Sequence, residues 1–190
     1  MVLTEDTIRT KRIELVDDGG EIRALLDADP SGSGAVGINL FDSGGNPRVS
    51  LAIAEDDTPT FSLHDESGTL RVWISSGPDG QGIRMCDDKG APRLQLQLDQ
   101  SGGADLLMLD QSGANRVVVS QMGDRGGAPI LLFKDENGKD RLQLQVGPES
   151  ISTIRFNGED GQLQVALGRD PDGESLFVYR DENGEQKRAF

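Results

Sequence analysis

Apolar and polar residues alternate in short stretches along almost the whole chain, and turn-forming residues separate these stretches. The alternation has a period of two, which indicates β-strands because successive side chains of a strand point to opposite faces of a sheet. No segment shows the 3.6-residue period of an amphipathic helix. The pattern therefore predicts an all-β protein built from short strands.

The alternating stretches belong to a tandem repeat that follows the pattern Asp-x-x-Gly-x-x-Arg. The glycines of successive copies lie 25, 23, 22, 23, 25, 23 and 23 residues apart, which is the signature of a repeat architecture. The complete copies are Asp17/Gly20/Arg23, Asp42/Gly45/Arg48, Asp65/Gly68/Arg71, Asp87/Gly90/Arg93, Asp110/Gly113/Arg116 and Asp135/Gly138/Arg141, and the degenerate ones are Gly158/Gly161/Gln164 and Asp181/Gly184/Lys187.

Apolar residues flank these turns at fixed positions. The second and fourth residues before each turn are apolar, for example Phe133 and Leu131 before Asp135. In six copies the first and third residues after the Arg position are also apolar, for example Leu142 and Leu144 after Arg141. Each unit is therefore predicted to contain a strand, a tight turn, a second strand and a variable loop.

The turn residues favour a β-hairpin. Asp-Glu-Asn-Gly at 135–138 and at 181–184 places Gly where a type I turn with a G1 bulge needs a positive φ. The turn Asp can accept nearby backbone N–H groups. The Arg six residues later can face that Asp across the base of the hairpin, as an opposite-charge cross-strand pair.

We therefore expect tandem β-hairpin repeats of about 23 residues, with about 16 short antiparallel strands forming an elongated meander. The expected organisation is an N-terminal lead-in over residues 1–11 and one repeat domain over residues 12–190. The alternative is a parallel β-solenoid, which would stack like-charged Asp and Arg columns at a spacing of about 4.8 Å. Hairpins are favoured for that reason.

A meander of this size with one apolar face needs a cover for that face. The sheet can wrap round on itself, fold into two layers, or pair its apolar face with other copies of the chain. A closed barrel of sixteen strands would be too wide for side chains to fill. On the other face we expect polar residues, among them Gln95, Gln97, Gln143 and Gln145, with some apolar ones, namely Leu25, Phe41, Trp73, Leu109 and Val118.

The hairpin units with an x-Gly turn resemble MORN-type repeats, which form long β-sheets used for assembly and binding. The chain differs from those repeats in having one Trp and one Tyr. The alternation of short apolar strands, a Gly turn and a variable loop also resembles the triple β-spiral shafts of viral and phage fibres, which are homotrimers. Neither resemblance assigns a functional residue.

Net charge and the distribution of apolar residues limit the expected partners and the expected location of the protein. The formal net charge of −14 disfavours nucleic acid and anionic lipid, since the field repels phosphate. The N-terminus has no apolar stretch typical of a Sec signal peptide, and no apolar run is long enough to span a bilayer. We therefore expect a protein of the cytoplasm, of a phage or virus particle, or one exported by a non-classical route, without membrane insertion.

Candidate chemistry is sparse. His64 and Cys86 are the only residues of their types, and both occupy the variable position just before a repeat Asp, so neither is assigned a catalytic or metal-binding role. Calcium prefers clustered oxygen ligands, and the Asp-rich stretches 135–140 and 170–174 resemble truncated calcium loops. Hairpin turns are the favoured interpretation of both stretches. No catalytic residue, cofactor or metal site is predicted.

These observations predict a non-enzymatic, self-assembling structural protein, such as a fibre, shaft or filament subunit. Its expected partner is itself, with a trimer favoured. The alternative is a monomeric scaffold that presents its variable loops, such as residues 27–36 and 121–129, to a protein or a carbohydrate.

Overall fold

The computed structural model describes residues 7–29, 34–77, 80–121, 127–147, 151–169 and 172–189. Every regular element within these ranges is a β-strand. None of the described segments forms a helix that could cross a lipid bilayer. The predicted all-β class is confirmed.

The chain divides into two compact units, the first comprising Met1–Pro78 with Asp88–Gly90 and the second comprising Asp79–Asp87 with Ala91–Phe190. The prediction of one repeat domain over residues 12–190 stays a prediction. The first unit contains β1 (Arg12–Val16), β2 (Ile22–Asp27), β3 (Val36–Phe41), β4 (Pro47–Ile53), β5 (Pro59–His64) and β6 (Leu70–Gly77).

The second unit contains ten strands. They are β7 (Gly80–Cys86), β8 (Pro92–Leu98), β9 (Ala104–Leu109), β10 (Asn115–Gln121), β11 (Pro129–Lys134), β12 (Asp140–Val146), β13 (Ser152–Asn157), β14 (Leu163–Arg169), β15 (Ser175–Arg180) and β16 (Gln186–Arg188).

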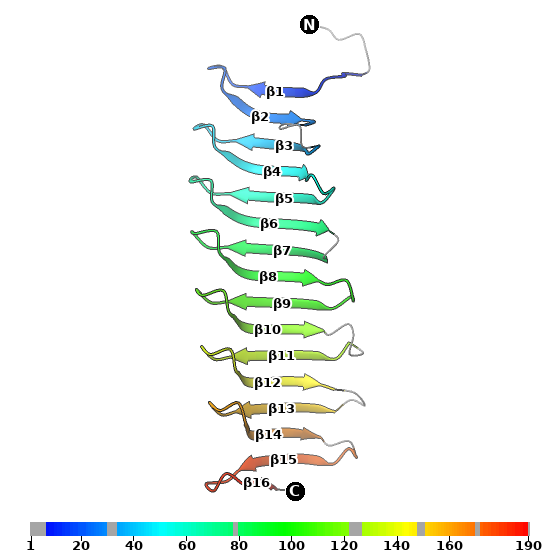
Figure 1. Ribbon diagram of the computed structural model, residues 1–190, viewed down its shortest axis with the longest axis vertical. Helices are drawn as coiled ribbons and strands as arrows, with labels where there is room; N and C mark the ends of the chain where they lie inside the picture. The colour runs from blue at the N-terminus through cyan, green and yellow to red at the C-terminus, as the bar shows by residue number, and fades with distance from the viewer. Residues whose placement is uncertain are drawn as a thin grey trace. The chain divides into compact units, whose positions relative to one another are not determined.

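Within each unit the strands follow one another in sequence order, and each pairs antiparallel with its neighbours (Figure 1). The solenoid alternative is therefore wrong, because a solenoid requires parallel pairing between coils. The predicted hairpin meander is confirmed. In each unit the Asp-x-x-Gly turns lie along one side of the sheet, and fully described connections of the other kind, such as residues 54–58 and 99–103, lie along the other, as Figure 1 shows.

Local sequence explains where the strands begin and end. Strands β4, β5, β8 and β11 begin with Pro, which has no N–H to donate and is tolerated at the first position of a strand. A register shift lies at the turn end of each hairpin from β1–β2 to β13–β14, for example between Phe133 and Lys134, where the bulge of the turn begins. At such a bulge two residues of one strand lie opposite one residue of its partner, and the turn Gly is part of this bulge.

Each unit is one layer of open sheet. Among the described residues, no large side chain is fully buried, and the buried apolar residues are Cys86, Leu107 and Ala166. A folded domain usually stabilises itself by packing two layers around an apolar core. The described part of this chain has no such core, because it forms a single layer of sheet.

Candidate interaction surface

The repeated turn is held by its Asp. In the β9–β10 hairpin, Gly113 has a φ of 85° and donates its N–H to the carbonyl of Asp110 across 3.1 Å. Asp110 in turn donates its N–H to the carbonyl of Ala114 across 2.9 Å. The Asp110 carboxylate accepts the N–H of Ser112 at 2.8 Å and that of Ala114 at 3.2 Å. This is the expected type I turn with a G1 bulge.

The other predicted turn glycines share this geometry. All of them have a φ between 77° and 85°, namely Gly20, Gly45, Gly68, Gly90, Gly138, Gly161 and Gly184. The same Gly N–H to Asp carbonyl bond closes the turns at Gly20 with Asp17 (3.0 Å), Gly45 with Asp42 (3.1 Å), Gly68 with Asp65 (3.1 Å), Gly138 with Asp135 (3.0 Å) and Gly184 with Asp181 (2.9 Å).

The predicted turn residues do not converge on one functional site. Each of Gly20, Gly45, Gly68 and Gly184 lies between the two strands of its own hairpin, and successive copies follow one another along the turn side of each unit (Figure 1). Their exposed positions and identical hydrogen bonds suit a backbone role in each hairpin. The two faces of the sheet are therefore the candidate interaction surfaces.

The repeat Arg joins two hairpins. Arg116 Nη1 lies 3.3 Å from Asp110 Oδ2 of its own turn, and its Nε donates to the carbonyl of Lys134 in the next hairpin across 2.9 Å. Arg48 and Arg141 make the same pair of contacts, with His64 and Asn157 as the carbonyl acceptors at 2.9 Å. Arg23 and Arg93 likewise reach both their own turn Asp and a carbonyl of the next hairpin.

Each complete repeat therefore has its Asp–Arg ion pair, including Arg71 with Asp65 at 3.4 Å. In the last repeat Lys187 replaces Arg and lies 3.5 Å from Asp181. All these Arg and Lys side chains are part-exposed, so each pair contributes modestly to stability. The predicted cross-strand pairing is confirmed, whereas the contact with the next hairpin was not expected from the sequence.

The turn hydrogen bonds favour the ionised carboxylate. The Ser112 hydroxyl donates to Asp110 at 2.6 Å and, together with backbone N–H groups and Arg116, lowers the pKa of Asp110 from 3.8 to about 2. The pKa of Asp17 is lowered chiefly by the N–H of Glu21, and that of Asp42 by the N–H of Asn46. These carboxylates stay charged at neutral pH and accept the backbone hydrogen bonds that hold their turns.

One turn of the same kind escaped the sequence analysis. Residues 99–102 repeat the Asp-Gln-Ser-Gly sequence of residues 110–113, but on the opposite side of the sheet. Gly102 has a φ of 81° and donates to the Asp99 carbonyl across 3.2 Å, while Ser101 donates to the Asp99 carboxylate. The identical tetrapeptide could have predicted this turn, but the position three residues after Gly102 is not Arg, so the turn does not match the repeat pattern.

The strand register assembles the flanking apolar residues into continuous rows on one face, which we call the apolar face. Directly opposite residues of antiparallel neighbours share a face, so the pairings define each row. In the second unit the central row crosses nine strands and comprises Ile83, Leu96, Leu106, Val119, Leu131, Leu144, Ile154, Leu167 and Phe177.

A second row on the same face lies nearer the Asp-x-x-Gly turns, and we call it the turn row. It comprises Met85, Leu94, Met108, Val117, Phe133, Leu142, Phe156, Val165 and Tyr179. Rows of the same kind cross β1–β6 in the first unit, where Leu51 lies opposite Phe61. These side chains are partly or largely exposed; Leu51 is 54% exposed and Leu96 50% exposed.

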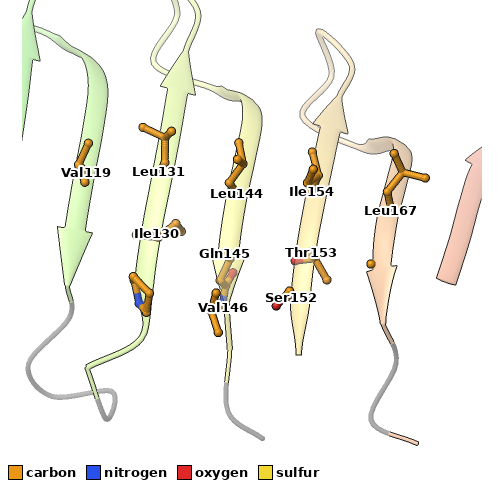
Figure 2. A pocket seen from close by; sticks show the side chains of 12 residues that line it. Val119, Ile130, Leu131, Leu144, Gln145, Val146, Ser152, Thr153, Ile154 and Leu167 are labelled. Carbon is orange, nitrogen blue, oxygen red and sulfur yellow. The ribbon is translucent and has the colours of Figure 1, made fainter. Parts of the chain in front are cut away.

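The apolar face of the second unit contains a hollow of about 500 Å³ over β10–β14. Figure 2 shows Val119, Leu131, Leu144, Ile154 and Leu167 side by side across these five strands. Pro129, Val146 and Ser152, nearer the loop ends, also line it. Most of the exposed lining is apolar, although Gln145, Ser152 and Thr153 also border the hollow, which therefore has the character of a contact surface for apolar side chains.

The opposite face is mixed, as predicted. Gln95 and Gln143 lie in one row with Leu107, Val118 and Leu132 between them. Cys86 belongs to this face and is buried. His64 pairs with Leu70 at the end of β5, and its Nδ1 is buried with no hydrogen-bond partner among the described residues.

The described residues contain no group of three or more His, Cys, Asp or Glu side chains placed to hold a metal ion. Asp135 is engaged by the backbone N–H groups of Asn137 and Lys139 and by Arg141, so the stretch 135–140 forms a hairpin turn. Asp170 and Pro171 of the other Asp-rich stretch lie outside the described residues. The same holds for residues 30–33 and 122–126 of the two variable loops.

The chain matches no protein-family model and no curated protein.

Proposed function

We propose that this protein is a non-enzymatic structural subunit that self-assembles by burying the apolar face of its sheet against other copies. One observation carries the proposal: two continuous apolar rows cross an open single-layer sheet, and none of the described residues covers them. Exposed apolar patches of this extent mark interaction surfaces. Association would supply the second layer that the described part of the chain lacks.

The size of the apolar face supports a stable homo-oligomer. In the second unit nine strands at a spacing of about 4.8 Å give a length of roughly 40 Å, and five residues along each strand give a width of about 15 Å with side chains. The footprint is about 600 Å², and projecting side chains add to its accessible area, so it approaches the roughly 800 Å² that each partner buries in a standard interface. The apolar rows of the first unit offer a further area.

The repeat residues have structural rather than chemical tasks in this proposal. The turn Asp side chains accept backbone hydrogen bonds and the Arg side chains connect successive hairpins. Variation in length is concentrated in the connections, while turns and apolar rows are maintained from copy to copy. These features suit a fibre, shaft or filament subunit, in which regular units stack in one dimension.

The test is the absolute mass of the untagged protein in solution, measured by size-exclusion chromatography with light scattering. We expect an oligomer, with mass a multiple of 20.4 kDa. Leu144→Lys places a charge in the central apolar row, whereas Gln143→Lys makes the same change in net charge on the opposite face. The Leu144 variant should dissociate and the Gln143 variant should not.

A monomeric wild-type protein at high concentration would refute the proposal. It would favour the scaffold that presents its loops to a protein or carbohydrate. Equal dissociation by both Lys variants would show that the apolar face is not the contact.

A further inference from the structure

The two ends of the odd strands differ in bulk on the apolar face of the second unit. Side chains four residues apart on one strand lie on the same face, about 13 Å apart. The turn end carries a large side chain and the loop end a small one in four successive odd strands: Met108 and Ala104, Phe133 and Pro129, Phe156 and Ser152, Tyr179 and Ser175.

This difference explains the hollow over β10–β14. Pro129, Val146 and Ser152 form its margin at the loop end, and their short side chains leave space beside the longer Leu131, Leu144 and Ile154 of the central row. At the turn end Phe133 and Phe156 remain 39% and 44% exposed. The same face therefore has a raised margin and a recessed margin.

Two symmetry axes can bring the apolar faces of two copies together. An axis parallel to the direction in which the strands succeed one another places the raised margin of one copy over the recessed margin of the other. An axis parallel to the strands places raised on raised and recessed on recessed. The second arrangement opposes aromatic side chains and leaves the hollow unfilled, and voids in an interface forfeit dispersion contacts.

We propose that copies of this chain associate around an axis parallel to the strand-succession direction, so that the turn row of one copy packs on the recessed loop-end margin of the next. Phe156 and Phe133 of one copy then fill the hollow of its neighbour. The proposal rests on the proposed self-assembly. It holds for a dimer and for a trimer, because a three-fold axis in the same direction also brings each turn row to a neighbour's loop-end margin.

The even strands that border the hollow, β10, β12 and β14, are compatible with this packing. Leu142 and Val146 stand at the two ends of β12, with a smaller side chain again at the loop end. Gln121 and Arg169, at the loop ends of β10 and β14, are exposed and have long side chains that can extend past the margin into water.

The test is the distance between identical spin labels on neighbouring copies, measured by pulsed electron resonance in the assembled protein. Labels are attached to cysteines introduced at Gln111, Glu136 or Glu182, one position at a time, in a Cys86→Ala background. These three exposed residues occupy equivalent positions in turns of the second unit. They lie outside the apolar face, and the mass of each labelled protein controls for its assembly.

The proposed axis gives nearly the same distance at all three positions, whatever the number of copies. An axis parallel to the strands gives distances that change strongly with position, since the turns at Gln111 and Glu182 are six strands, about 29 Å, apart within one copy. Such a dependence would overturn this inference and leave self-assembly standing. A monomeric mass with no dipolar signal would overturn the proposed function itself.

Discussion

The guanidinium group of Arg116 donates a hydrogen bond from Nε to the backbone carbonyl of Lys134, across 2.9 Å. Arg116 belongs to β10 and Lys134 to β11, so the bond connects one hairpin to the next. The same side chain reaches Asp110 in its own turn. One residue of the repeat therefore stabilises both the hairpin and its connection to the neighbour, in a protein whose described residues have no interior core.

Replacing Arg116 with Met should lower the free energy of unfolding by about 1 kcal/mol, because it removes one hydrogen bond to a carbonyl and one part-exposed ion pair. Urea denaturation followed by circular dichroism measures the change. Arg155→Met is the matched control, since Arg155 is exposed on the same face of β13. An equal loss in both variants would show that the effect comes from general charge and not from the connection between hairpins.

The turn glycines are needed for their backbone conformation. Gly138 has a φ of 77°, and a Cβ built on it meets no atom within 4 Å. Gly138→Ala should therefore cost about 1–2 kcal/mol of stability from the left-handed conformation alone. Gly138→Asn should cost less, because Asn tolerates this region better than other residues. Urea midpoints of the two variants test the order, and an Asn variant as unstable as the Ala variant would contradict it.

The hairpins and their Asp–Arg pairs could be predicted because they depend on residues close in sequence. Asp110, Gly113 and Arg116 determine their own turn. The contact of Arg116 with Lys134 could not be predicted, since it requires the lateral register between hairpins. The same limit applies to the apolar face: period two indicates that Leu142 and Leu144 share a face, but not which residues of β13 lie beside them.

The missing core also could not be decided from the sequence. Alternation is compatible with one layer, two layers or a closed sheet, because in all three the apolar residues of a strand share one face. The single layer depends on the path of the chain between hairpins. The hollow depends on the register of Pro129, Val146 and Ser152, which lie on three different strands.

Acid should weaken the hairpins. The pKa of Asp110 is about 2 in the fold and 3.8 ordinarily, so its contribution to stability is complete above pH 4 or so and is lost as the pH falls through about 2. The urea midpoint should therefore fall across this window. The wild type should lose more stability there than Asp110→Asn, which has no carboxylate at this turn. Identical pH profiles would show that Asp110 contributes nothing through its ionisation.

The seventh turn should be improvable. Gly158 and Gln164 replace Asp and Arg there, and neighbouring hairpins partly compensate: Lys139 donates to the Glu159 carbonyl across 2.7 Å and Arg180 donates to the Leu163 carbonyl across 3.3 Å. The double variant Gly158→Asp/Gln164→Arg restores the repeat residues and should raise stability by about 1 kcal/mol.

The two substitutions have to be made together. A Cβ at residue 158 meets the Gln164 side-chain nitrogen at 2.6 Å and the Asp160 carboxylate at 2.8 Å, so both flexible side chains must move. Gly158→Asp alone should gain less than the pair. Urea denaturation of the wild type and of the three variants gives the coupling between the sites. A double variant less stable than the wild type would mean that restoring the repeat residues does not stabilise this turn.

Salt should strengthen assembly. Each copy carries a net charge of −14, so bringing copies together costs electrostatic repulsion, which is screened over about 8 Å at physiological ionic strength and about 3 Å at 1 M. The dissociation constant for the assembly should fall as the sodium chloride concentration is raised.

The double variant Glu136→Lys/Glu182→Lys tests the role of net charge. Each substitution changes the net charge by two, from −14 to −10 in total, at exposed turns away from the apolar face. This variant should assemble more tightly at low salt and respond less to added salt. A salt response equal to that of the wild type would assign the effect to stronger apolar association and not to screened repulsion.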